Sequence, residues 1–128
     1  MLYSDKIEAL TSEILDITSF AKEEIPLNCP AALAERLTKI SSYLARTGEI
    51  FATAKLILCE QEQNIRDVMA DELSRLKPTE QKRTITYKTR HTQYLIDLAE
   101  RLNHEMVNIG NNVRKQIQYN IDQMHNLS

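Results

Sequence analysis

The sequence predicts an all-α fold, in which a long antiparallel helical hairpin is joined by a shorter N-terminal helix. Only two glycines and three prolines occur in 128 residues, too few for the many turns of a β-sandwich or barrel. Long stretches repeat apolar residues at intervals of three and four. The composition is 42% hydrophobic and 27% charged, so the chain can build a core, and its length fits one helical domain over residues 1–128.

The first helix is predicted over residues 4–25. Ser4 is a suitable N-cap, with acidic residues close behind it. The apolar positions lie on one face of a helix, at Ile7, Leu10, Ile14, Ile17 and Ala21. Pro26 ends the helix, because the residue before a proline avoids the α region.

The second helix is predicted over residues 30–76. Asn28 can cap it, and Pro30 stands in the first turn, where a missing N–H costs nothing. Its apolar pattern runs through Leu33, Leu37, Ile40, Leu44, Thr47, Phe51, Ala54 and Leu58, and the core stripe includes Leu37, Leu44, Phe51 and Leu58. Gly48 interrupts this pattern, which indicates either a kink or a close approach to a neighbouring helix.

The third helix is predicted over residues 80–125, with a stripe that includes Leu95, Leu102, Ile109 and Val113. Gly110 weakens it locally, and whether the long helices break at the two glycines stays open. Nine residues from 103 to 128 are Asn or Gln. These amides are either neutral surface positions or, at Asn120, a device that fixes register or oligomeric state.

The two long stripes are similar in length, so we expect them to fold back on each other. The first helix then completes a three-helix, coiled-coil-like bundle. Because that helix is only half as long, part of the apolar stripe stays exposed. A second subunit would cover it, and we expect a homo-oligomer, most simply a dimer.

Basic residues concentrate in residues 77–91, KPTEQKRTITYKTRH. Residues 1–76 carry eight basic and thirteen acidic side chains, a net −5, and residues 92–128 carry three and four, a net −1. Residues 77–91 carry five cations against one carboxylate, a net +4. The cations are Lys77, Lys82, Arg83, Lys88 and Arg90. The whole chain has a net charge of −2, which does not favour general binding of polyanions. Any binding of an anion is therefore expected at this segment.

Three interpretations of residues 77–91 stay open. We predict a turn at the end of the hairpin, with Thr79 capping the last helix, and its cations are then simply solvated. Alternatively, they bind the phosphates of a nucleic acid or nucleotide, helped by threonine hydroxyls and backbone N–H groups. In the third interpretation they bind an acidic partner protein, which includes the acidic region of another copy.

No catalytic, metal or cofactor site is predicted. His104-Glu105 is followed by Asn108 where a zinc protease helix needs a second histidine. Cys59 has acidic neighbours, which would raise the pKa of a thiol, and Cys29 stands in a linker. The two glycines lie far apart, so no phosphate-binding loop exists. We therefore expect a protein that is not an enzyme.

The sequence predicts a cytoplasmic protein. It has no run of about 18 apolar residues that could span a membrane. The N-terminus lacks the apolar region of a signal peptide. The two cysteines lack CxxC spacing and are expected to be reduced thiols.

From Tyr43 to Asp122 the layout resembles small helical accessory proteins of bacteriophages and prophages. The resemblance rests on the "ATAK" step from Ala52 to Lys55, the polar segment KRTITYKTRHTQY, and the later step NNVRKQIQYNI. It implies a non-enzymatic role, in DNA transactions or in sequestering a host protein or nucleotide. It assigns no functional residues.

The sequence thus supports two hypotheses on function. In the first, the chain is a helical interaction protein that binds a partner protein or itself. In the alternative, it binds nucleic acid or a nucleotide through Lys82, Arg83, Lys88 and Arg90.

Overall fold

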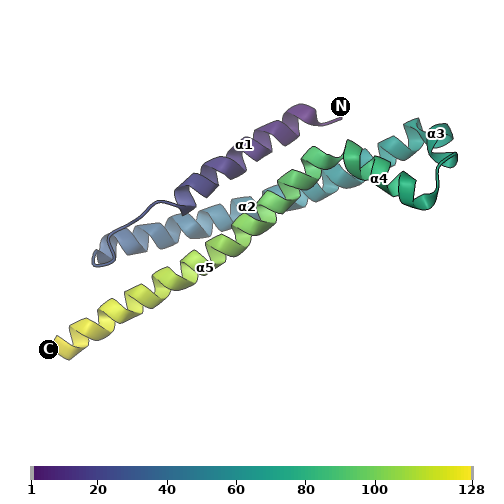
Figure 1. Cartoon of the computed structure of the whole chain (residues 1–128). Helices are drawn as coiled ribbons and strands as arrows, with labels where there is room; N and C mark the ends of the chain where they lie inside the picture. The colour runs from purple at the N-terminus through teal and green to yellow at the C-terminus, as the bar shows by residue number, and fades with distance from the viewer. Residues whose placement is uncertain (1, 128) are drawn as a thin grey trace.

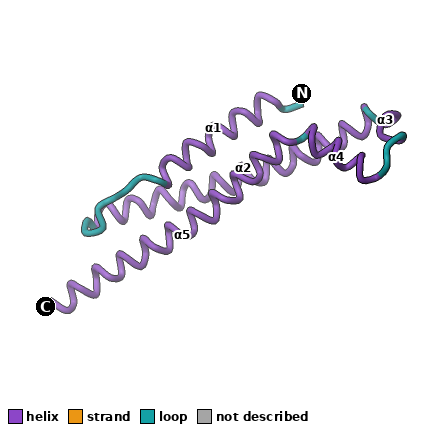
Figure 2. The backbone as a smooth tube through the Cα atoms, viewed as in Figure 1, coloured by secondary structure: helices purple, strands orange, loops and turns teal. Residues whose placement is uncertain are grey.

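The computed structural model describes residues 2–127, which contain helices and connecting segments but no strand (Figure 1, Figure 2). The prediction of an all-α fold is therefore confirmed. The long helices α2 (Pro30–Val68) and α5 (Arg90–Leu127) run in opposite directions and pack along each other, and α1 (Ser4–Ala21) packs chiefly on α5. The short helices α3 (Ala70–Ser74) and α4 (Pro78–Lys88) form the end of the molecule opposite the C-terminus.

Helix α1 ends at Ala21, short of the predicted residue 25. Arg36 of α2 satisfies this helix end, since its guanidinium donates hydrogen bonds to the carbonyl oxygens of Ala21 at 3.2 Å and of Glu23 at 3.1 Å. Arg36 is only 5% exposed and lies over the ring of Phe20, 4.1 Å from its centroid. The carbonyl groups at a helix end need partners, and here a cation near the negative end of the helix supplies them.

Helix α2 begins at Pro30 as predicted but ends at Val68, not at residue 76. Met69 leaves the helical region at φ −106° and ψ 23°, and the five-residue helix α3 follows. Gly48 causes no break, since α2 continues through it. Apart from its chain neighbours and the backbone of its own helix, no heavy atom lies within 4 Å of the position that a Cβ would take there, so Gly48 makes no close approach to another helix.

The turn is much shorter than the segment 77–91, because residues 78–88 form helix α4, and the predicted helix start at residue 80 lies two residues too late. Lys77 is extended, and Pro78 takes the first helical position, where its fixed φ suits a helix. Thr79 is therefore inside the helix and is not its N-cap. The true connection is short, and the side-chain amide of Gln81 stabilises it by donating to the carbonyls of Leu73 at 2.8 Å and Leu76 at 3.0 Å.

The predicted third helix is divided at Thr89, which separates α4 from α5. Thr89 has φ −109° and ψ 15°, and its buried hydroxyl donates to the carbonyl of Ile85 at 2.8 Å. A threonine hydroxyl that bonds back to the preceding turn competes with the helical pattern and often bends a helix. Gly110, in contrast, lies inside an uninterrupted α5.

The core lies between α1, α2 and α5. Of the predicted stripe, Leu95, Leu102 and Val113 are buried in it. The other members are partly buried at its margin, namely Leu37, Leu44, Phe51, Leu58 and Ile109. The fully buried positions of α2 include Leu33, Ile40 and Ala54, which belong to its predicted apolar pattern, and Ile50, which does not. Ile50 is buried as well because α2 contacts both α1 and α5.

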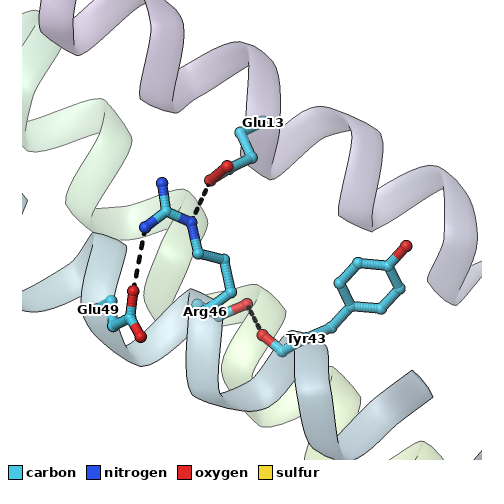
Figure 3. Close-up of polar contacts among 5 residues, drawn as sticks. Glu13, Tyr43, Arg46 and Glu49 are labelled. Atoms are coloured by element: carbon cyan, nitrogen blue, oxygen red, sulfur yellow. Dashed lines mark hydrogen bonds and ion pairs between the residues drawn. The ribbon is translucent and has the colours of Figure 1, made fainter.

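Polar contacts also connect the helices. Figure 3 shows Arg46 of α2 between Glu13 of α1, 2.6 Å from its Nε, and Glu49 of α2, 3.1 Å away. The hydrogen bond to Glu13, followed by that to Glu49, raises the pKa of Arg46. The site is half-exposed, so each pair stabilises the fold by no more than about 1 kcal/mol.

A buried polar pair joins α2 and α5 at the end of the bundle nearest α3 and α4. Thr92 of α5 donates a hydrogen bond to the side-chain oxygen of Gln61 in α2, and both residues are buried. The Gln61 amide in turn donates to the carbonyl of Leu2 at 2.7 Å. These partners fix the register of α2 against α5, since a shift of either helix would leave buried polar groups unpaired.

Candidate functional site

Helix α4 presents most of its surface to solvent. Within α4 only Ile85 is buried, and within α3 only Leu73. One narrow apolar edge therefore holds α4 in place. Most of the rest of its circumference, which includes Lys82, Arg83 and Lys88, is exposed.

A shallow hollow of about 560 Å³ lies along one side of α4, and three of the predicted cations line it. The lining residues that belong to α4 follow the three- and four-residue spacing of one helix face, and the first residue of α5 completes the lining. They are Thr79, Lys82, Arg83, Thr86, Tyr87 and Arg90. The helical conformation thus gathers cations that a flexible turn would have left dispersed.

A second hollow of about 340 Å³ lies beside the first, between the end of α2 and the junction of α4 with α5. Its lining residues are Leu2, Gln61, Asn64, Ile65, Tyr87, Lys88 and Arg90. Because Tyr87 and Arg90 line both hollows, they form a ridge between them. We call these two residues the ridge. The fifth predicted cation, Lys77, lines neither hollow.

The ridge is a stacked pair. The guanidinium of Arg90 lies over the ring of Tyr87, 4.2 Å from its centroid, and donates a hydrogen bond to the Tyr87 carbonyl at 2.9 Å. Tyr87 is nevertheless 65% exposed. The contact therefore positions both side chains without removing either from solvent.

The positive charge of this surface is uncompensated. No aspartate or glutamate lines either hollow. In residues 2–127 the ion pairs within 4.0 Å join residues of α1, α2 and the segment between them, and none includes Lys77, Lys82, Arg83, Lys88 or Arg90. All five cations are exposed. Such a surface attracts anions, and its attraction falls as salt increases.

Two other hollows differ in character. The larger, about 640 Å³ between α2, α3 and α4, includes Glu62 as well as Arg66 and Lys82, so its charges are mixed. The other, about 470 Å³ between α1 and the start of α5, contains the side chains of Leu15, which is 47% exposed, and Tyr94, which is 51% exposed. It is a candidate for apolar contact.

The residues considered for catalysis lie apart from these hollows. Cys29 and Cys59 are exposed free thiols. His104 is exposed on α5. Among the described residues, no group of three or more His, Cys, Asp or Glu side chains could hold a metal ion. Within the same part of the chain, no helix is long and apolar enough to cross a membrane.

Sequence reasoning missed Tyr87 and Asn64 as members of this surface. A signal for Tyr87 was present, since it lies four residues after Arg83 and three before Arg90, on one face if the segment is helical. The predicted helix over residues 80–125 already contained this spacing. Asn64 had no such signal, because only the packing of α2 beside α4 brings it there.

Comparison with family models gives no match to this chain, and no curated protein and no solved structure is significantly similar to it. The resemblance to phage accessory proteins therefore stays a prediction.

Proposed function

We propose that this chain is a non-enzymatic binding protein whose α4 surface holds a phosphate-rich polymer, that is, a nucleic acid. The observation that carries the proposal is the clustering of Lys82, Arg83, Lys88 and Arg90 around the two hollows, with no carboxylate in their lining. Clustered cations gain affinity for nucleic acid by releasing its counterions. The hydroxyls of Thr79 and Thr86 are further partners for phosphate oxygens.

The test is charge reversal, in which Lys82, Arg83, Lys88 and Arg90 are all changed to Glu. Binding to a labelled oligonucleotide is measured by fluorescence anisotropy across a salt series. For four neutralised phosphates, the wild-type slope of log K against log salt should be about −3 to −4, and the variant should lose salt-dependent binding.

A matched control reverses four exposed cations elsewhere and gives the same net charge. These are Lys6, Lys22, Arg101 and Lys115. If binding needs only total charge, the two variants lose equally, and the α4 surface is not the site. A wild-type protein that binds no oligonucleotide even at low salt contradicts the proposal altogether.

A second candidate function is interaction with another protein chain, most simply self-association. It is supported by the hollow between α1 and α5, where Leu15 and Tyr94 are half-exposed beside Ile7. Burying such side chains against a second copy stabilises a dimer by about 25 cal/mol for each Å² removed from water.

Light scattering after size-exclusion chromatography tests self-association. Leu15→Glu with Tyr94→Glu should shift a dimer to monomer, whereas Leu56→Glu, at an exposed leucine of α2, should leave it unchanged. A wild-type monomer at micromolar concentration excludes self-association and leaves nucleic-acid binding untouched.

A further inference from the structure

We infer that the polymer held by α4 is a single-stranded nucleic acid, with phosphates along the cationic hollow and one base against the ridge of Tyr87 and Arg90. This inference rests on the proposed function and specifies its ligand. Three features of the surface support it: the line of cations, the exposed stacking pair and the apolar hollow behind that pair.

The first feature positions the strand. From Lys82 to Lys88, α4 rises about 9 Å at 1.5 Å a residue, and Arg90 follows at the start of α5. Thr79 and Thr86 alternate with them along the same face. A flexible strand can follow such a line with two or three consecutive phosphates.

The second feature accepts a base. Nucleobases stack on aromatic rings and on guanidinium planes, and the ridge offers one of each, already in contact at 4.2 Å. Because Arg90 is held over Tyr87 and bonded to its carbonyl, the pair is ordered before the ligand arrives. Less conformational freedom is then lost on binding.

The third feature surrounds that base. Behind the ridge, Leu2 and Ile65 supply apolar contact, and Lys88 remains free for a phosphate. The exposed amide of Asn64 lies in the same hollow and can donate to or accept from a base edge. The volume of about 340 Å³ lies within the range of small-ligand sites, about 300–1,000 Å³.

These features favour a single strand over the two other anionic polymers. The bases of a duplex are already stacked and paired, so a duplex could use the cations but would leave the ridge and the apolar hollow empty. An acidic peptide could pair with the cations, but it has no flat ring to stack. Only unpaired bases use the whole surface.

The test compares four probes of similar charge by anisotropy at low salt. They are oligothymidylate of about 12 nucleotides, an abasic oligonucleotide of the same length, a short duplex and a polyglutamate peptide. Oligothymidylate should bind most tightly. Tyr87→Leu should weaken its binding about 5- to 100-fold, whereas Tyr87→Phe, which keeps the stacking face, should stay close to wild type.

Binding of the abasic probe should be insensitive to Tyr87→Leu, because that probe has no bases to stack. If wild type binds all four probes alike and Tyr87→Leu changes none, the single-strand inference is overturned while the anionic surface stands. Tighter binding of the duplex or the peptide overturns it in favour of that ligand. If no probe binds, both the inference and the proposed function fail.

Discussion

Two regions of the molecule, the three-helix segment and the tip, differ in how much of their surface is buried. In the three-helix segment, formed by α1 with residues 33–61 of α2 and 92–113 of α5, the side chains of Ile14, Ile50 and Met106 have no exposure to solvent. At the tip, formed by α3, α4 and the turn between them, only Leu73 and Ile85 are buried. Stability is therefore concentrated in the first region and accessible surface in the second.

Charge is distributed in the same way. In the three-helix segment Arg36, Lys39 and Arg46 have carboxylate partners within 4.0 Å. Around the ridge, Lys82, Arg83, Lys88 and Arg90 have no carboxylate partner within that distance among residues 2–127. Repulsion among these cations destabilises the tip. Because the tip contributes few buried contacts to the core, the protein as a whole loses little stability.

The largest expected effect is loss of the central core. Ile14→Ala should lower the free energy of unfolding by about 2–5 kcal/mol, because the surrounding helices cannot collapse fully into the space left. Urea denaturation followed by circular dichroism measures it. The neighbouring Leu15→Ala, at a half-exposed position, is the control and should change stability by less than about 0.5 kcal/mol. Equal effects would contradict the assignment of the core to this face of α1.

The next effect concerns the end of α1. Arg36→Ala removes two hydrogen bonds to the carbonyls of Ala21 and Glu23 and the contact with Phe20, and should cost about 2–3 kcal/mol. Arg36→Met keeps the apolar stem but not the donors, so it should recover only part of this loss. Hydrogen exchange should show the C-terminal turn of α1 opening first. Full recovery in the methionine variant would mean that packing, and not hydrogen bonding, holds this helix end.

The contrast between Ile14 and Arg36 shows what the sequence can and cannot predict. Ile14 belongs to a regular apolar stripe, and such stripes located the helices and most of the core. Arg36 breaks the pattern, because its burial depends on carbonyl groups of α1 that a helical period does not reveal. The buried pair of Gln61 and Thr92 was missed for the same reason.

The helix breaks follow a similar logic. Gly48 and Gly110 were the expected weak points, yet both helices continue through them, since packing outweighs a propensity cost of about 1 kcal/mol. The breaks occur instead at Met69 and Thr89, whose residue types carry no such warning. The cations of the candidate site were found by composition alone, and their arrangement depends on helix α4 and on its junction with α5 at Thr89.

A smaller effect should be confined to the tip. Ile85→Ala should lower the free energy of local opening of α4 by about 1–2 kcal/mol. The effect is modest because Ile85 lies at the edge of the core, where neighbouring side chains can fill the space left. Amide exchange in α1 and in the middle of α5 should stay within about 0.5 kcal/mol of wild type. Equal loss of protection throughout the chain would show that the tip and the three-helix segment unfold as one unit.

The smallest expected effect is an increase in stability, from a substitution in the three-helix segment. Gly48→Ala should stabilise the protein by about 0.5–1 kcal/mol, because alanine restricts the unfolded chain and favours the helix that α2 already forms there. Nothing lies within 4 Å of the added Cβ, so no clash offsets the gain. Gly110→Ala is the matched comparison, since its Cβ would meet Ile40 Cγ2 at 3.5 Å, an ordinary contact. A loss of stability at Gly48, measured by urea denaturation, would mean that the straight path of α2 needs a glycine after all.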